Sequence, residues 1–307
     1  MRALMKAKEG IAVREVPAPR PGDDEVLIRV MLAGLCRTDV FVAEGRIPGK
    51  ADVILGHEFS GIVEQAGMRA GDLKQGDRVT AMPVMPCGRC DICASGLQDR
   101  CQSTTMLGID HDGAFSEYIA VPASAVYKIP DTLSFRLAAY SEPVAAALSV
   151  MKSGIAPEQR GVIYGNNRFG HLIDRILKAY GFGSVTIFDP AEGRPLRENA
   201  YDFAIETLAT EKTLRELMVA LKPGGKIVLK SRKHEPVGIN LSLAVKKEVT
   251  LTAVNYGDFA ESIRLMAEGL IQVDDLLGTE HTLEEFAAVF ERSKTLETQK
   301  VFFNPGA

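Results

Sequence analysis

Four cysteines within fifteen residues, in the stretch CGRCDICASGLQDRC, constrain this chain more than any other feature. Their spacing is C-x2-C-x2-C-x7-C, and the residues are Cys87, Cys90, Cys93 and Cys101. Tetrahedral zinc binds four thiolates at about 2.3 Å, and a short loop that turns at Gly88 and Gly96 can supply all four. Iron–sulfur clusters also use four thiolates, and four small apolar loop residues are the simplest alternative. Because the loop is polar and nothing else in the chain suggests electron transfer, we predict a structural zinc.

The composition of the chain is that of an ordinary globular protein. Its 307 residues are 46% hydrophobic and 25% charged, which is enough for two domains. The net charge of -4 offers no basic surface for nucleic acid, and no apolar run is long enough to cross a bilayer. The odd count of five cysteines argues against a disulfide framework. We therefore expect a cytoplasmic protein with no nucleic-acid partner and no membrane partner.

A second set of metal-binding residue types lies outside the cysteine cluster. Cys36 in GLCRTDV, His57 in LGHEFSGIV and Glu142 in SEPVAAAL offer one sulfur, one nitrogen and one oxygen ligand. Three protein ligands leave the fourth position of a zinc ion open, which is typical of a catalytic site. Taken singly, each residue also has a plain structural interpretation, as a buried thiol, a core histidine or a helix start. Glu58 follows His57, and side chains of adjacent extended residues point to opposite faces, so we assign Glu58 to a supporting position or to transient ligation.

From about residue 160 to 270 the sequence alternates between strand-like and helix-like segments. The expected strands are 161–165, 184–189, 201–207, 225–231 and 249–254, and the expected helices are 171–182 and 214–225. This alternation predicts a parallel, doubly wound sheet. Only about eleven residues separate Asp189 from the next strand, too few for the helix and strand that a full Rossmann domain places there. We predict a truncated Rossmann sheet of five strands, ordered 2-1-4-5-6, with one wall of the adenine site missing.

The first turn of this sheet, GNNRFG, departs from the dinucleotide fingerprint G-x-G-x-x-G at its middle position. Gly165 and Gly170 keep the tight turn and the close helix–strand packing, whereas Asn167 replaces the glycine that lets the backbone approach a pyrophosphate. Asparagine tolerates left-handed backbone, and its amide could donate to a phosphate oxygen. Asp189 ends the second strand, where a carboxylate accepts from a ribose 2′-hydroxyl and repels a 2′-phosphate. We expect weakened but retained cofactor binding, with NAD favoured over NADP.

Together these motifs resemble the zinc-dependent medium-chain dehydrogenase/reductase family, nearest its polyol and threonine dehydrogenase branch. The segments GLCRTDV, GHEFSGIV, the four-cysteine lobe, DGAFSEYIAVP and SEPVAAAL occur in the family's order and cover nearly the whole chain. The resemblance implies an α/β protein with a GroES-like β-barrel catalytic domain at 1–150 and 272–307, and a Rossmann nucleotide-binding domain at 151–271. It also implies two zinc ions per chain, hydride transfer to NAD or NADP, and a homodimer or homotetramer.

The resemblance also gives roles to single residues. Thr38 matches the hydroxyl that takes the alcohol proton, and Asp39 matches the carboxylate that orients the metal-bound histidine. Arg37 and Lys300 match basic residues that contact the cofactor pyrophosphate, although both could also be solvated surface cations. Many relatives carry a proton-relay histidine five residues after the cysteine ligand, and this chain has Phe41 there. The relay therefore uses another group, or the pocket is rebuilt for a more apolar substrate.

Two enzyme classes are compatible with these residues. The leading hypothesis is a zinc oxidoreductase that transfers hydride between a secondary alcohol (a polyol, an amino alcohol or a biosynthetic intermediate) and NAD, with the ketone as the other small-molecule partner. The alternative is a zinc lyase, isomerase or cyclase on the same scaffold that has lost nicotinamide use, which Asn167 and the missing adenine wall favour. A non-enzymatic scaffold is the third possibility, and the open metal position argues against it.

Overall fold

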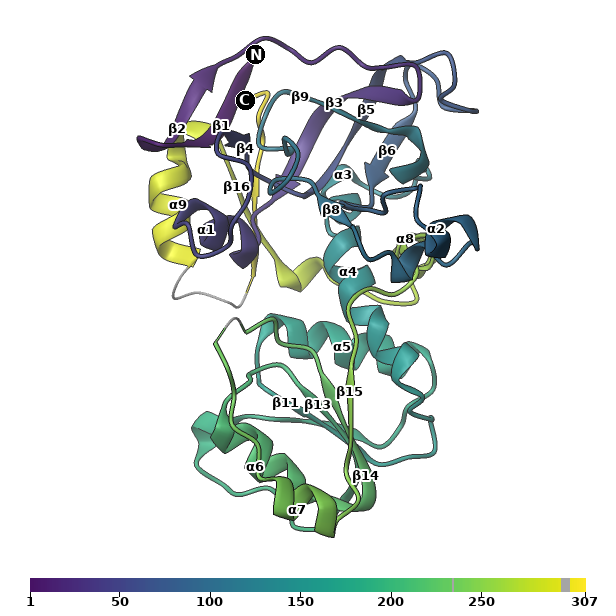
Figure 1. The fold of residues 1–307 in the computed structure, drawn as a ribbon, viewed down its shortest axis with the longest axis vertical. Coiled ribbons are helices and arrows are strands. Elements are labelled where there is room, and N and C mark those ends of the chain that lie inside the picture. The colour runs from purple at the N-terminus through teal and green to yellow at the C-terminus, as the bar shows by residue number, and fades with distance from the viewer. Residues whose placement is uncertain (234, 294–298) are drawn as a thin grey trace. The chain divides into compact units, whose positions relative to one another are not determined.

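The computed structural model describes residues 1–233, 235–293 and 299–307 (Figure 1). These residues divide into two compact units, the first formed by Met1–Glu142 with Asp274–Ala307 and the second by Pro143–Val273. The domain limits expected from the sequence, near residues 150 and 272, remain a proposal beside this division. Among the described residues, no helix combines the length and the apolar character that crossing a membrane requires.

The first unit is built on β-sheets. A seven-stranded sheet has the order β10-β6-β5-β3-β17-β16, with β9 also paired to β3, while β2-β1-β4 and β7-β8 form two smaller sheets. In the large sheet β16 and β17 are parallel and the other pairs are antiparallel. The strands are β1 Arg2–Ala7, β2 Gly10–Glu15, β3 Glu25–Gly34, β4 Val53–Ile54, β5 Glu58–Ala66, β6 Arg78–Ala81, β7 Val84–Met85, β8 Thr105–Met106, β9 Tyr118–Pro122, β10 Val126–Lys128, β16 Leu277–His281 and β17 Lys300–Phe303.

Strand β3 is the central element of this unit, because it pairs with β5, β9 and β17. Its sequence, EVLIRVMLAG, buries every second residue along most of its length, as expected for a strand with one face on a core. Val26, Ile28 and Val30 face that core. Phe115 and Phe303 join them and meet edge to face, with ring centroids 4.9 Å apart. The first and last parts of the chain are thereby joined in one hydrophobic core.

Short helices occupy the connections of the first unit. They are α1 Arg37–Ala43, α2 Asp91–Ala94, α3 Phe135–Ala138 and α9 Phe286–Ser293, and α4, Ser141–Leu148, contains the point at which the chain passes from one unit to the other. The carboxy-terminal segment contains β16, α9 and β17. Residues 294–298 lie outside the described residues.

The second unit contains a five-stranded sheet in the order β12-β11-β13-β14-β15, and all four pairings are parallel. The strands are β11 Gly161–Tyr164, β12 Val185–Phe188, β13 Tyr201–Glu206, β14 Leu221–Leu229 and β15 Thr250–Ala253. In the numbering of a full Rossmann sheet, whose third strand is missing here, this order is 2-1-4-5-6. The prediction of a truncated doubly wound sheet is confirmed.

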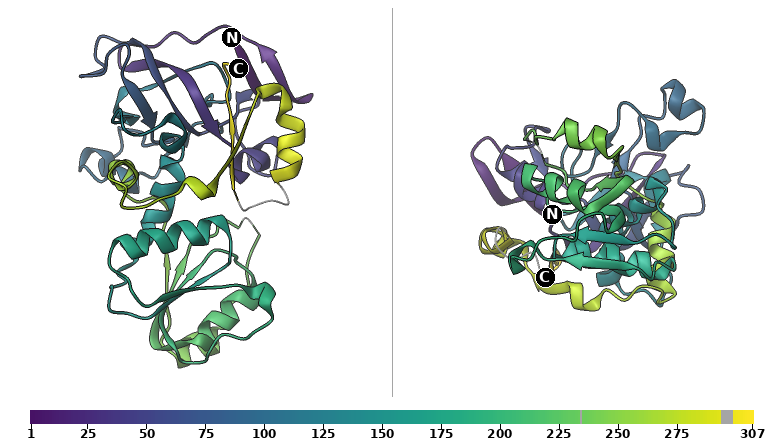
Figure 2. Two further views of the ribbon diagram at one scale, coloured as in Figure 1. Left: turned by 180° about the vertical axis from the view of Figure 1, so that it is seen from behind. Right: turned by 90° about the horizontal axis from the view of Figure 1, so that it is seen from below.

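Helices cover both faces of this sheet. They are α5 Arg168–Ala179, α6 Glu211–Ala220 and α7 Leu241–Lys246, and a further helix of the unit, α8 Phe259–Ala267, contacts the end of α5 through the hydrogen bond from the Tyr180 hydroxyl to Glu261. Because side chains alternate along β11, Val162 and Tyr164 pack with Leu217 of α6 and Leu243 of α7, and Ile163 points to the other face, close to Gly170 of α5. Helices α6 and α7 lie beside one another against the sheet (Figures 1 and 2).

The truncation lies directly after β12. One 3-10 turn, Pro190–Glu192, follows the strand, and residues 189–200, all of them described, contain no further helix or strand before β13. Leu196 and Ala200 from this connection pack against the same core as Phe188. Strand β12 is therefore the edge of the sheet, and the short connection closes the core beside it.

Phe203 is the residue on which we test the packing of the second unit. It is fully buried, its ring meets that of Phe182 edge to face at 6.0 Å, and it lies against Gly161, where any added Cβ would be 2.2 Å from the ring. We expect Phe203→Ala to lower the free energy of unfolding by about 3–5 kcal/mol, because it leaves a cavity. Urea unfolding followed by circular dichroism measures this loss. Leu270→Ala, at a side chain 50% exposed, should change it by less than about 0.5 kcal/mol, and equal losses would contradict the packing.

Candidate functional site

The four-cysteine lobe brings its sulfur atoms together as the spacing predicts. The sulfur atoms of Cys87, Cys90, Cys93 and Cys101 all lie within 4.8 Å of one another. Gly88 and Gly96 adopt positive φ angles of 69° and 81°, which lets the loop turn back on itself. All five cysteines of the chain, each within the described part, are free thiols. The lobe therefore has the donor set and the convergence that a tetrahedral zinc requires.

The surroundings of the lobe shift the pKa values of its thiols in opposite directions. The backbone N–H groups of Arg89 and Cys90 lower the pKa of the Cys87 thiol to about 6. Burial raises the pKa of the Cys93 thiol to about 12. Cys101 accepts hydrogen bonds from the backbone N–H groups of Cys87 at 3.3 Å and Ser103 at 3.4 Å. Backbone donors aimed at sulfur stabilise thiolates, which are the form that binds a metal.

A second convergence of metal-binding atoms lies where β3, α1 and β5 meet. Cys36 is the N-cap of α1, and His57 comes just before β5, which begins at Glu58. One ligand atom from each of these three residues lies within 4.8 Å of the other two. His57 and Glu58 are buried, and Cys36 is half-buried. One sulfur, one nitrogen and one carboxylate oxygen therefore meet at a single point with a partly open side.

Asp39 holds His57 in place, as the family resemblance led us to expect. Its Oδ1 lies 2.9 Å from His57 Nδ1 and accepts the Gly56 N–H at 3.2 Å, and its Oδ2 accepts the Cys36 N–H at 2.8 Å. Burial opposes a positive charge on His57, but Asp39 and Cys36 outweigh it and raise the pKa of His57 well above its ordinary value. The surroundings of the ring thus favour positive charge.

The other ring nitrogen of His57 is the best indication of a missing partner. His57 Nε2 is buried and, among the described residues, has no hydrogen-bond partner. A buried polar atom without a partner costs about 1–3 kcal/mol. A metal ion bound to Nε2 removes that cost, and the Asp39 contact at Nδ1 fixes the tautomer that leaves Nε2 available. The residues present therefore fit a metal ion.

Glu58 is part of this cluster, which differs from the sequence prediction. We expected alternation to point His57 and Glu58 apart, but alternation holds only inside a strand, and His57 lies before β5 begins. Glu142, predicted as the oxygen ligand, is buried in the first turn of α4 but does not belong to the group of atoms within 4.8 Å. Burial raises the pKa of Glu58, and the nearby Glu142 adds to that rise. The two carboxylates are therefore neighbours, with Glu58 nearer to Cys36 and His57.

Lys300 has a different partner from the one we predicted. Its ammonium forms an ion pair with Glu58 and donates to the Leu35 carbonyl at 2.8 Å, and its side chain is 1% exposed. Lys300 therefore neutralises the buried carboxylate of Glu58, close to Cys36 and His57. It does not make the contact with a cofactor pyrophosphate that we predicted. Gly34 leaves room for the pair, because a Cβ there would lie 2.7 Å from Glu58 and 3.1 Å from Lys300.

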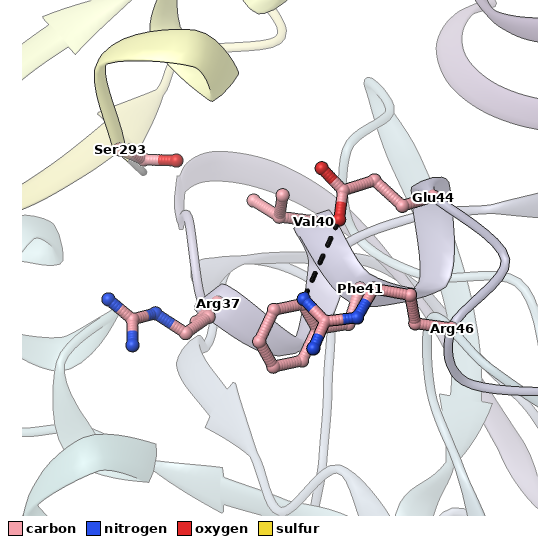
Figure 3. A pocket seen from close by; sticks show the side chains of 6 residues that line it. All are labelled: Arg37, Val40, Phe41, Glu44, Arg46 and Ser293. Atoms are coloured by element: carbon pink, nitrogen blue, oxygen red, sulfur yellow. Dashed lines mark ion pairs between the residues drawn. The ribbon is translucent and has the colours of Figure 1, made fainter. Parts of the chain in front are cut away.

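The other predicted residues of this unit lie on α1. Thr38 is half-buried in its first turn, and Arg37 is exposed at its first position. Phe41, at the position of the relatives' histidine, lies one turn after Arg37 and lines a cavity with it (Figure 3). Arg46 lies over the Phe41 ring, and no sequence pattern had singled it out.

In the turn between β11 and α5, Gly165 and Gly170 allow the tight turn and the close helix–strand packing predicted for them. Gly165 has a φ of 128°, and a Cβ there would meet the Thr207 hydroxyl at 2.2 Å. A Cβ on Gly170 would meet the Gly165 carbonyl at 2.4 Å, so only glycine allows α5 to approach β11 this closely.

Asn167 behaves differently from our expectation. It is the N-cap of α5 with an extended φ of -134°, so the tolerance of asparagine for left-handed backbone is not used. Its Oδ1 accepts the Gly170 N–H at 2.9 Å, and its Nδ2 donates to Thr207 Oγ1 at 2.9 Å. Both ends of the amide are therefore engaged inside the protein, and one of the helix N–H groups that could bind a phosphate is already capped.

Asp189, predicted as the last residue of the second strand, directly follows β12, which ends at Phe188, and it is half-buried. Its carboxylate accepts the Asn166 side-chain amide at 2.9 Å and the Ala191 N–H at 2.8 Å. These two donors lower the pKa of Asp189, so the group is charged at neutral pH. A carboxylate has more acceptor positions than these two bonds occupy, so it can still accept from a ligand hydroxyl.

The sequence and the structure of this chain are similar to those of known dehydrogenases. Residues 22–131 match the alcohol dehydrogenase GroES-like domain. The sorbitol dehydrogenase of Halalkalibacterium halodurans is 28% identical over 344 aligned positions covering 99% of each chain. The starvation-sensing protein RspB of Escherichia coli K12 is 30% identical over 296 positions covering 87% of each chain. A Sinorhizobium meliloti protein assigned to the zinc-binding dehydrogenases, solved with NADP, superposes with a TM-score of 0.90 at 28% identity over 99% of each chain.

These similarities agree with both sheets of the structure. The GroES-like match falls in the first unit, and the parallel sheet of the second has the Rossmann arrangement, so the predicted α/β fold class is confirmed. The alignment with the sorbitol dehydrogenase is longer than the 307 residues of this chain, which agrees with a shortened connection after β12. This chain belongs to the zinc-dependent medium-chain dehydrogenase/reductase family.

Proposed function

We propose that this chain is a zinc-dependent oxidoreductase that transfers hydride between a secondary alcohol and NAD. The observation that supports this most is the buried His57 Nε2, unpartnered among the described residues, in a ring that converges with Cys36 and Glu58. A set of three donors leaves room for a substrate oxygen, which a purely structural metal site does not need. The substrate class is a polyol, an amino alcohol or a biosynthetic intermediate, with the ketone on the other side of the reaction.

The residues around the metal site have distinct tasks. Cys36 and His57 are the sulfur and nitrogen ligands, and the oxygen ligand is Glu58 in the arrangement described, with Glu142 as the adjoining carboxylate. Asp39 accepts from His57 Nδ1 and so directs Nε2 toward the metal. A zinc ion bound there would supply the Lewis acidity that lowers the pKa of an alcohol hydroxyl.

Proton transfer falls to Thr38, on the basis of the resemblance. Thr38 follows Arg37 in the first turn of α1, two residues after Cys36, and is only half-buried. Its hydroxyl can accept a proton from a substrate hydroxyl and donate its own toward solvent. Phe41 has no exchangeable proton, so we propose that water completes the relay from Thr38.

The four-cysteine lobe holds a second zinc with a structural task. Its four sulfurs form a closed set, so the ion has no position for substrate. Two zinc ions per chain, one catalytic and one structural, are therefore part of the proposal.

NAD is the proposed hydride acceptor, bound at the turn between β11 and α5. Asp189 supports NAD over NADP, because its charged carboxylate repels a 2′-phosphate. Arg194 pairs with Glu192 in the same connection, which reduces the attraction that its guanidinium would exert on such a phosphate.

One observation favours a second function. Asn167 caps the Gly170 N–H that would otherwise face a pyrophosphate, and the sheet lacks a strand beyond β12. A zinc lyase, isomerase or cyclase would need neither a free N–H for a pyrophosphate nor the missing strand. It would still need Cys36 and His57. Nucleotide binding separates the two functions.

We further propose that the protein acts in the cytoplasm, where its five free thiols remain reduced, and that it forms a homodimer or homotetramer. Strand β15, at the other edge of the parallel sheet, is exposed over most of its length and offers a pairing surface.

Zinc content tests the assignment of the two metal sites. Cys36→Ser should lower the bound zinc from about two ions to about one per chain and abolish alcohol oxidation, because it removes a ligand of the catalytic ion only. Cys87→Ser should also lower zinc to about one ion, but it should reduce thermal stability as well. Atomic absorption on dialysed protein measures both. Two retained zinc ions in Cys36→Ser would contradict the catalytic site.

Asp39→Asn tests whether Asp39 acts by orienting His57. The amide keeps the size of the carboxylate but cannot accept at all three positions, so zinc affinity should fall about 10–100-fold. Competition with a fluorescent chelator measures the affinity without relying on activity. Asp131→Asn is the control, because that side chain is fully exposed and should leave the affinity unchanged. Equal affinities in both variants would show that Asp39 has no such task.

Calorimetric titration of the zinc-loaded protein with NAD and with NADP tests the cofactor. NAD should bind more tightly than NADP. Asp189→Ala should weaken the affinity for NAD about tenfold, because the acceptor for the ribose hydroxyl is lost. The same variant should reduce the difference in affinity between NAD and NADP, because the charge that repels the 2′-phosphate is lost as well. Asp72→Ala, at a carboxylate 91% exposed, is the matched control. If neither nucleotide binds at millimolar concentration, the oxidoreductase proposal fails and the lyase, isomerase or cyclase class takes its place.

A further inference from the structure

A chain of three side chains links the end of β12 to the first turns of α5. The Asn166 side-chain amide donates from Nδ2 to Asp189 Oδ2 at 2.9 Å, and Asn166 Oδ1 lies 2.8 Å from His171 Nε2. Asn166 is exposed in the turn before α5, and His171 is half-buried inside the helix. No sequence pattern had singled out Asn166 or His171.

The parallel register of the sheet brings these residues together. Tyr164 lies opposite Phe188, and the Gly165 N–H donates to the Phe188 carbonyl at 3.0 Å, so β11 and β12 end at the same edge. Asn166 and Asp189 therefore leave neighbouring strands at nearly the same level. In open parallel sheets, ligands bind outside this edge, at the point where the strand order reverses, which here lies beside β11.

The charge on Asp189 decides the direction of every hydrogen bond in the chain. The Asn166 amide and the Ala191 N–H lower the pKa of Asp189, and a charged carboxylate only accepts. Asn166 must therefore turn Nδ2 toward Asp189 and Oδ1 toward His171. Because an amide oxygen also only accepts, His171 Nε2 carries a proton and donates it. The Asn166 amide is thus held at both ends and has one orientation.

Asp189 keeps acceptor capacity for two hydroxyl groups. Its Oδ2 accepts from Asn166, and its Oδ1 accepts from the Ala191 N–H at 2.8 Å. A carboxylate has about four acceptor positions, so these two contacts with described residues leave one position on each oxygen. A vicinal diol presents two O–H donors side by side and matches that pair. The ribose of a nucleotide carries such a diol in its 2′- and 3′-hydroxyls.

The direction in which Asp189 points affects how well it binds this diol. Within the described residues no strand lies beyond β12, so Asp189 is held from the side of β11, by Asn166. A side chain whose rotation is already restricted loses less freedom when the ligand binds. A fixed direction also keeps the negative charge beside the 2′ position, where it repels a phosphate more strongly than a carboxylate that turns away.

We propose that Asn166 and His171 are positioning residues, which hold the Asp189 carboxylate in the direction that accepts the vicinal diol of a nucleotide ribose. His171 orients the Asn166 amide, and the amide orients Asp189. Together they strengthen the preference for a 2′-hydroxyl over a 2′-phosphate. This inference rests on the proposed binding of a dinucleotide at this turn, but not on the reaction that follows.

Calorimetric titration of the full-length, zinc-loaded protein with ADP and with 2′-deoxy-ADP tests the proposal, because the two compounds differ only in the 2′-hydroxyl. ADP should bind about tenfold more tightly, since its hydroxyl donates to a charged acceptor. Asn166→Ala should lower this ratio of dissociation constants to about three, because Asp189 is no longer held in one direction. A variant that only disturbed the turn would weaken both compounds by the same factor.

Variants of His171 test the outer part of the chain. His171→Ala should lower the same ratio, because the Asn166 amide is then free to rotate, whereas His171→Gln keeps an N–H donor and should retain most of it. His111→Ala, at an exposed histidine of the first unit, is the matched control. In an Asp189→Ala background, Asn166→Ala should not change the affinity for ADP further, because it acts through that carboxylate. Urea midpoints verify that each variant is folded.

The inference is overturned if the unchanged protein binds ADP and 2′-deoxy-ADP equally, or binds neither at millimolar concentration. It is also overturned if Asn166→Ala or His171→Ala keeps the full ratio, or if the two variants weaken both compounds by the same factor. NAD-dependent alcohol oxidation by a protein whose ratio ignores Asn166 would overturn this inference alone. A ratio that depends on Asn166, in a protein that oxidises no alcohol, would instead overturn the oxidoreductase proposal alone.

Discussion

The buried carboxylate of Asp39 is the contact on which the metal-binding cluster depends. It is 1% exposed, and its two oxygens bind groups from separate parts of the first unit: the backbone N–H groups of Cys36 and Gly56, and the His57 ring. A charge at this depth is stable only when such donors surround it. By satisfying Asp39, the chain also sets the position of both the thiol and the imidazole. The convergence of donor atoms thus follows from the contacts of one carboxylate.

Features with local causes could be predicted from the sequence. The four-cysteine spacing, the glycine turns at Gly165 and Gly170, and the five-strand order each follow from short segments or from alternation, and each agrees with the structure. Details that depend on where an element begins, or on distant residues, could not. The strand boundary at Glu58 decides which carboxylate joins His57, and burial beside Glu58 decides that Lys300 faces inward. No periodic pattern records either fact.

Asn167 limits what the turn between β11 and α5 can offer to an anion. Its side chain accepts the Gly170 N–H and donates to Thr207, so both ends of the amide are engaged inside the protein. Because that N–H is already capped, an anion at this turn would meet one backbone donor fewer.

The ion pair between Glu58 and Lys300 has a consequence for how the protein is made. Glu58 lies near the start of the chain and Lys300 in its last strand, yet each is the buried counter-ion of the other. During synthesis, the whole of the second unit emerges after Glu58 and before Lys300, and until Lys300 emerges Glu58 lacks this counter-ion. The second unit, Pro143–Val273, holds all its strands within one continuous segment and can fold while it emerges. The first unit is therefore begun before the second unit is made and completed after it.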